Sequence, residues 1–169
     1  MKEENNSGLY TADLEHDSCG VGFIANIKGR KSHQIVQDGL TMLSRMAHRG
    51  ACGCEPNTGD GAGILIQVPH EFLLGECTRI GIRLPRFGEY GVGLIFFPAE
   101  ERVREECRKV LERQIKKMNL VLLGYRPVPT HNDSVGETAR SAEPVMEQIF
   151  IKRPEAIASP DDFERKLFV

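Results

Sequence analysis

The stretch Asp17-Ser18-Cys19-Gly20-Val21-Gly22-Phe23 marks the point at which the chain changes character. Residues 1–18 are polar and acidic and show no hydrophobic periodicity. From Cys19 to Ile27 the sequence is apolar with interspersed glycines, a pattern typical of a strand, and Lys28-Gly29-Arg30 then predicts a turn. We therefore predict an arm at residues 1–18 and a folded domain that opens with a strand at Cys19.

The composition is that of a folded domain with nearly balanced charge. The chain has 169 residues, 40% of them hydrophobic, and 22 basic against 24 acidic side chains. This balance gives no long-range attraction to nucleic acid or to an anionic membrane. The apolar runs are far too short to span a bilayer, and no apolar stretch follows the charged N-terminus as a secretory signal requires. We expect a cytoplasmic protein with neither a nucleic-acid nor a membrane partner.

Hydrophobic periodicity and capping signals predict helices from Ser32 to Gly50, over roughly 69–80, from Pro98 to Asn119, and from Ser159 onward. Further strands are predicted at 62–68, 91–97, 120–125 and 144–152, and residues 126–143 read as a loop. The helix after Pro98 carries one apolar stripe, made of Val103, Cys107, Val110, Leu111, Ile115 and Met118. This element order indicates a mixed α and β domain and leaves the order of its layers open.

The five cysteines do not suggest a metal site. Cys52 and Cys54 lie in a glycine-rich loop, but a structural zinc site needs four ligands in spaced pairs. Cys77 and Cys107 fall on predicted helices and supply no second pair. We predict reduced thiols and no metal ligand in this chain.

Cys19 is the candidate nucleophile. If it were the first residue of the mature chain, its thiol and its free α-amine would have unperturbed pKa values of about 8.5 and about 8, close enough for proton exchange near neutral pH. That chemistry needs no histidine partner, but it requires the bond between Ser18 and Cys19 to be cut. Taken alone, Cys19 is better explained as a small apolar residue of a strand.

The sequence resembles the class II glutamine amidotransferases, which are N-terminal-nucleophile hydrolases, and within them the large chain of glutamate synthase. The resemblance runs in order along nearly the whole chain, over Glu15–Phe23, Lys28–His33, His48–Ala51, Thr58–Ile64, Glu143-Pro144 and Phe163–Leu167. It implies an α+β fold, the four-layer αββα sandwich of antiparallel sheets. Residues 19–169 would be the N-terminal portion of that domain, truncated at its C-terminus.

The resemblance also implies roles for individual residues. Cys19 would be the catalytic nucleophile, freed by self-cleavage between Ser18 and Cys19, and Arg49, Gly50 and Asp60 would belong to the substrate pocket. From the residues alone, Arg49 could instead be a basic residue that interacts with the dipole at a helix C-terminus.

In such an enzyme the substrate is glutamine, and the released ammonia serves glutamate synthesis from 2-oxoglutarate. The resemblance implies FMN and an iron–sulfur cluster in the parent enzyme and no cofactor in this segment. The implied partners are the remaining domains of the large chain and a small electron-supplying subunit. The Asn-Gly pair that forms the family's oxyanion hole does not occur in this sequence, so we expect the isolated chain to have little or no activity. A split or non-catalytic subunit of the same fold, and an α+β domain without chemistry, stay open as alternatives.

Overall fold

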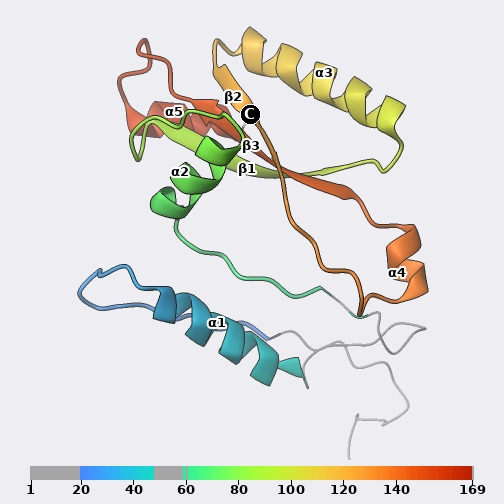
Figure 1. The fold of residues 1–169 in the computed structure, drawn as a ribbon. Coiled ribbons are helices and arrows are strands. Elements are labelled where there is room, and N and C mark those ends of the chain that lie inside the picture. The colour runs from blue at the N-terminus through green and yellow to red at the C-terminus, as the bar shows by residue number, and fades with distance from the viewer. Residues whose placement is uncertain (1–19, 48–58, 60, 169) are drawn as a thin grey trace, which may run out of the picture. The chain divides into compact units, whose positions relative to one another are not determined.

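The computed structural model describes residues 20–47, 59 and 61–168, and it divides into two compact units, unit 1 (Met1–Ile66) and unit 2 (Gln67–Val169). The main element of unit 1 is α1 (His33–Arg45), drawn in blue in Figure 1. The Ser32 hydroxyl accepts a hydrogen bond from the Gln34 amide at 3.1 Å, so the predicted cap is confirmed. The helix ends at Arg45, five residues before the predicted end at Gly50.

The turn before α1 also forms as predicted. The Asn26 side-chain oxygen accepts hydrogen bonds from the Lys28 and Arg30 amides at 2.9 Å and 3.3 Å. The Gly29 amide donates to the Asn26 carbonyl at 2.8 Å, and the φ of Gly29 is 64°, a conformation that favours glycine. Asparagine and glycine therefore fix this turn locally.

The strands predicted at 19–27 and 62–68 are wrong over their described residues. Residues 20–26 and 61–68 are irregular there, and neither segment joins a sheet. Large apolar side chains on both segments are exposed, among them Val21 at 96% and Leu65 at 100%. A strand is stable only with a hydrogen-bonded neighbour, and a sequence pattern cannot supply that neighbour.

Unit 2 is built on an antiparallel sheet of β1 (Tyr90–Phe97), β2 (Val121–Pro127) and β3 (Val145–Lys152) in the order β1-β3-β2 (Figure 1). The strands predicted at 91–97, 120–125 and 144–152 are therefore confirmed. A register shift between Leu122 and Gly124 interrupts the pairing of β2 with β3. Gly124 suits this irregularity because its φ is 152° and a Cβ there would lie 2.8 Å from Ile82.

Helices cover both faces of this sheet. Neighbouring residues of a strand point to opposite faces, and Phe150 and Ile149 each anchor one core cluster. Phe150 packs with Leu73 and Cys77 of α2 (His70–Arg79). Ile149 packs with Ile115 of α3 (Glu101–Lys117) and Phe163 of α5 (Pro160–Leu167). Each buried side chain of this size stabilises the fold by about 1.5–3 kcal/mol.

Two predictions for unit 2 need correction. α3 starts at Glu101, three residues after Pro98, and Val110 is 48% exposed rather than part of the buried stripe. On α3, Arg108 takes the inward position instead of Val110, because its guanidinium forms an ion pair there. The loop predicted at 126–143 contains a short helix, α4 (Glu137–Ser141). Arg140 on α4 donates a hydrogen bond to the Asn132 carbonyl at 2.9 Å. A hydrophobic pattern in the sequence does not predict this contact.

Asn119, predicted as the stop of the helix, has a φ of 56° directly after α3. For most residues with a Cβ this conformation costs roughly 1–2 kcal/mol. The cost is smaller for asparagine and smallest for glycine, which has no Cβ. We expect Asn119→Ala to destabilise unit 2 by about 1 kcal/mol and Asn119→Gly to be neutral or stabilising. Amide hydrogen exchange in α3 and β2 measures both, with the exposed Lys117→Ala as control; equal protection in the alanine and glycine variants would contradict the prediction.

Candidate functional site

The predicted site residues Ser18, Cys19, Arg49, Gly50 and Asp60 lie outside the described residues, as do Cys52 and Cys54. The structure does describe the segments that adjoin them. Gly20 follows Cys19 directly, α1 ends four residues before Arg49, and residue 61 follows Asp60.

The three segments meet around one cavity of about 470 Å³ inside unit 1. Its walls are Gly20–Ile24, one side of α1 and the stretch from Gly63 to Ile66. Stretches that are far apart in the sequence, and that each adjoin a candidate residue, thus share one cavity.

The described side chains that line this cavity are apolar. The α1 side contributes aliphatic and thioether groups, including Ile35, Met42 and Met46, and none of the described lining residues has a polar side chain.

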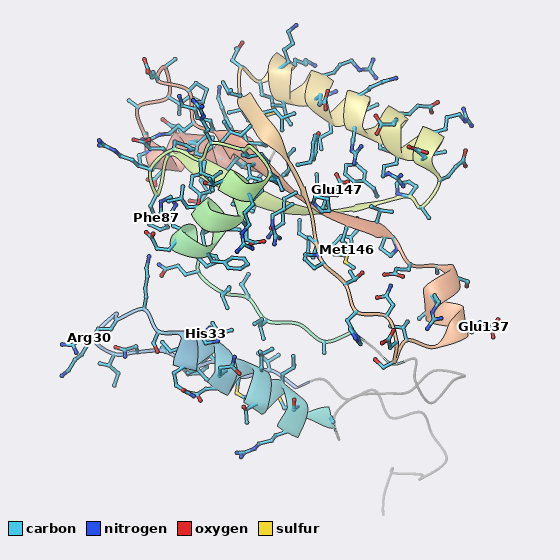
Figure 2. All side chains as sticks on the ribbon, in the orientation of Figure 1. Arg30, His33, Phe87, Glu137, Met146 and Glu147 are labelled. Carbon is cyan, nitrogen blue, oxygen red and sulfur yellow. The ribbon has the colours of Figure 1, made fainter. Side chains whose placement is uncertain are left out.

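Unit 2 contains buried charged side chains that the sequence pattern did not predict. The carboxylate of Glu147 is on a residue only 5% exposed, and it accepts a hydrogen bond from Arg108 of α3. Figure 2 labels Glu147 on β3, beneath α3. Arg108 also pairs with Glu105, and its guanidinium lies 5.5 Å from the ring centres of Phe97 and Tyr125. Burial opposes the charge of Arg108, but its two acidic partners outweigh burial and raise its pKa.

A second ion pair lies on the opposite face of the sheet. Arg126, 8% exposed, donates to Glu76 of α2 at 2.8 Å and to Gln148 at 3.0 Å. The hydrogen bond from Arg126 lowers the pKa of Glu76 and keeps its carboxylate charged. Both pairs tie a helix to the sheet, so their role is structural. In the sequence, the one sign of these ion pairs was Glu147. It stands at an inward position of a strand whose other inward residues are apolar.

The described part of the chain offers no other reactive centre of the predicted kinds. Within it, no group of three or more His, Cys, Asp or Glu side chains could hold a metal ion. Cys77 is fully buried, and burial raises the pKa of its thiol, which disfavours the reactive thiolate. None of the helices between residues 20 and 168 that are described has the length and apolarity to cross a membrane.

Burial, with a smaller contribution from the Glu112 carboxylate, raises the pKa of Tyr125 to about 12. Because the folded state holds this proton more tightly than the unfolded state, the contribution of Tyr125 is complete below about pH 10 and is lost as the pH rises toward 12. We expect Tyr125→Phe to flatten the loss of stability in this range. The 295 nm absorbance difference between wild type and Tyr125→Phe gives the titration directly; a midpoint near pH 10 would contradict it.

Comparison with known proteins identifies the family. The model of the class-II glutamine amidotransferases matches residues 19–169, so the chain belongs to this family. The chain is 41% identical to the glutamate synthase [NADPH] large chain of Bacillus subtilis over 162 residues, 96% of this chain. It is 43% identical to the glutamate synthase [NADH] of Saccharomyces cerevisiae over 83% of this chain. It is 37% identical to ferredoxin-dependent glutamate synthase 2 of Synechocystis over 92% of this chain.

The matched segment is a small part of these relatives, 10% of the Bacillus and Synechocystis proteins and 7% of the yeast protein. Their names give three electron donors, NADPH, NADH and ferredoxin, at comparable identity. The shared segment is therefore common to enzymes with different donors. The predicted resemblance is confirmed at the level of the family and of its glutamate synthase members.

Proposed function

We propose that this chain is the N-terminal portion of the glutaminase domain of a glutamate synthase large chain, with an arm at residues 1–18 that is removed before Cys19. The observation that carries the proposal is the start of the family match at Cys19, the residue directly after the polar arm. Relatives from a bacterium and from a yeast are both named glutamate synthases, which supports the assignment to a glutamate synthase. The four-layer αββα sandwich belongs to this proposal, and the α+β character of unit 2 is compatible with it.

The reaction follows from the chemistry of an N-terminal cysteine. The α-amine of Cys19 takes the thiol proton, and the thiolate attacks the side-chain amide carbon of glutamine. The C–N bond breaks, ammonia leaves with the proton returned by the amine, and a γ-glutamyl thioester forms on Cys19. Water then hydrolyses the thioester to glutamate and regenerates the thiol. No redox change occurs in this half of the reaction.

Arg49, Gly50 and Asp60 are the proposed substrate-pocket residues. The cation of Arg49 near the thiol would favour the thiolate. Support for this grouping comes from the segments beside Cys19, Arg49 and Asp60, which share the walls of one apolar cavity.

The second half of the proposed reaction takes place outside these residues. Ammonia would be consumed there in the reductive amination of 2-oxoglutarate, with FMN and an iron–sulfur cluster in the remaining domains and electrons from a small subunit. The named electron donors of the relatives support a redox partner for the complete protein. We place this protein in the cytoplasm as part of the same proposal.

The experiment that tests this function compares two activities of the complete protein: glutamate formation with glutamine and with ammonia as nitrogen donor. We expect Arg49→Ala to lower the glutamine-dependent rate on the order of 10²-fold, because positioning and thiolate stabilisation are lost together. The ammonia-dependent rate should stay close to that of wild type. Arg45→Ala, at the last residue of α1, is the matched control on the same segment. Equal losses in both activities for Arg49→Ala would contradict the assignment.

A further inference from the structure

The outer edge of β1 has no neighbouring strand among the described residues. In the order β1-β3-β2, β3 lies on one side of β1, and the other side carries no described strand. No residue of Tyr90–Phe97 is charged or a proline, and Leu94 and Phe96 are 52% and 60% exposed. Proteins protect open sheet edges with charges, prolines or bulges, because an open apolar edge pairs with other chains. At the opposite edge, β2 has a register shift and Pro127. The unprotected composition of β1 therefore indicates an edge that is covered in the complete protein.

The register of β1 with β3 fixes which backbone groups face this open edge. The Arg153 amide donates to the Glu89 carbonyl at 2.8 Å, and this pair continues the register that joins Tyr90 to Lys152. Hydrogen-bonded and non-hydrogen-bonded pairs alternate along an antiparallel ladder, so every second residue after Glu89 bonds to β3. The amides that face β3 belong to Gly91, Gly93, Ile95 and Phe97, and those that face the open edge belong to Val92, Leu94 and Phe96.

The connections within unit 2 show in which direction across the sheet the chain proceeds. β1 and β2 are both antiparallel to β3, so they are parallel to each other, and α3 lies in the connection between them. α3 and α5 cover the same face, since Ile115 and Phe163 pack in one cluster with Ile149. Crossover connections have the same handedness in almost all proteins. Because β1 and β3 run in opposite directions, the handedness that takes the chain from β1 past β3 to β2 takes it from β3 past β1 after α5.

The end of α5 already lies at β1. A Cβ placed on Gly91 would overlap the end of the Leu167 side chain, so the last residue of α5 lies against the backbone of β1. This chain covers 10% of the Bacillus subtilis large chain, and in the proposed function more of the protein follows α5. A segment that leaves α5 at this point starts beside the open edge.

We propose that the segment after α5 in the complete protein forms a fourth strand, which pairs with the outer edge of β1 and runs antiparallel to it. This inference rests on the proposed function, in which the chain is the N-terminal portion of a longer domain. With that strand, unit 2 has the β-α-β-β-α-β arrangement of ferredoxin-like folds, with α3 and α5 on one face. The added strand bonds to the outward-facing backbone groups of Val92, Leu94 and Phe96.

Residue-resolved amide hydrogen exchange of the complete protein tests this proposal without any substitution. With a covered edge, Val92, Leu94 and Phe96 should exchange at least about 100-fold more slowly than the same residues in an unstructured chain. Their protection should then resemble that of Gly93 and Ile95, which face β3. With an open edge, protection would alternate along β1, present at Gly93 and Ile95 and absent at the three outward-facing residues, and the proposal would be overturned.

A pair of variants tests the same edge by stability. Leu94→Pro removes an outward-facing amide, whereas Leu94→Ala removes the side chain and keeps the amide. Proline is tolerated in an edge strand when the lost amide faces solvent. If a strand covers this edge, Leu94→Pro should raise exchange in the peptide of β3 by about 10-fold or more over Leu94→Ala, because a ladder hydrogen bond is lost. Equal exchange in the two variants would contradict a covered edge.

The identity of the added strand is read from an electron cryomicroscopy map of the complete protein. We expect the strand beside β1 to be the first one after α5. A strand from a second copy, or from another part of the chain, would overturn the proposal. None of these readings depends on Cys19. If the edge is open but Cys19→Ala loses the glutamine reaction, only this inference fails; if Cys19→Ala keeps that reaction, the proposed function fails whatever covers β1.

Discussion

Replacing Cys19 by alanine is expected to lower glutamine-dependent glutamate formation by the complete protein by on the order of 10⁴-fold or more. Alanine removes the sulfur that must form the thioester, so no covalent path remains. Ammonia-dependent synthesis should persist, because in the proposed enzyme it uses other domains. Both rates are measured on the same preparation, so that their ratio is independent of the amount of active protein.

Two further variants make this expectation sharper. Cys19→Ser retains a hydroxyl and the α-amine, but it is a weaker nucleophile, so its glutamine-dependent rate should also fall severely. Cys77→Ala removes a buried thiol of unit 2 and should leave the ratio unchanged, even if it lowers stability. A parallel fall of both activities in a folded Cys19→Ala protein would show that Cys19 is not a dedicated glutaminase nucleophile.

The largest expected effect on stability comes from Arg108→Met. Glu147 would then stay buried without its cation, and its second oxygen already has no hydrogen-bond partner among the described residues. Breaking a buried pair from one side typically costs about 3–5 kcal/mol. We expect a loss of this size in the opening free energy of β3, measured by hydrogen exchange of the peptide that covers Val145–Lys152.

The reverse substitution is expected to be milder. In Glu147→Leu the guanidinium of Arg108 keeps Glu105 and the rings of Phe97 and Tyr125, and its side chain is already 24% exposed. The double variant Arg108→Met/Glu147→Leu leaves no unpaired charge and should recover most of the protection. Arg102→Met removes two ion pairs, with Glu100 and Glu106, from the same helix at a side chain 76% exposed and should change little. A Glu147→Leu variant less stable than Arg108→Met would contradict this account.

Short sequence signals predicted those parts of the fold that depend only on residues close together in the chain. The cap at Ser32, the turn at Gly29 and the stop at Asn119 follow from side chains that satisfy or permit a particular backbone conformation, and all three form. The three strands of unit 2 also form, because each finds a hydrogen-bonded neighbour within unit 2. The strands predicted on either side of α1 show the same pattern in the sequence but have no described neighbour to pair with.

The buried charged side chains show a second limit of prediction from the sequence. Arg108 and Glu147 are far apart in the sequence, and only the packing of α3 on β3 brings them together. Arg108 accordingly takes an inward place that periodicity assigned to Val110. For the candidate site, a resemblance supplied the roles of Cys19, Arg49 and Asp60, since an isolated cysteine at the head of a strand pattern does not reveal a nucleophile.

One measurement tests the central claim most directly: peptide mass spectrometry of the complete protein after treatment with a glutamine-like diazo-ketone. We expect the adduct on Cys19, in a peptide whose first residue is Cys19 and whose α-amine is free, so that processing and nucleophile are read from one spectrum. Excess glutamine should protect this residue. An adduct on Cys52 or Cys54 instead, or an active protein that still carries residues 1–18, would contradict the account.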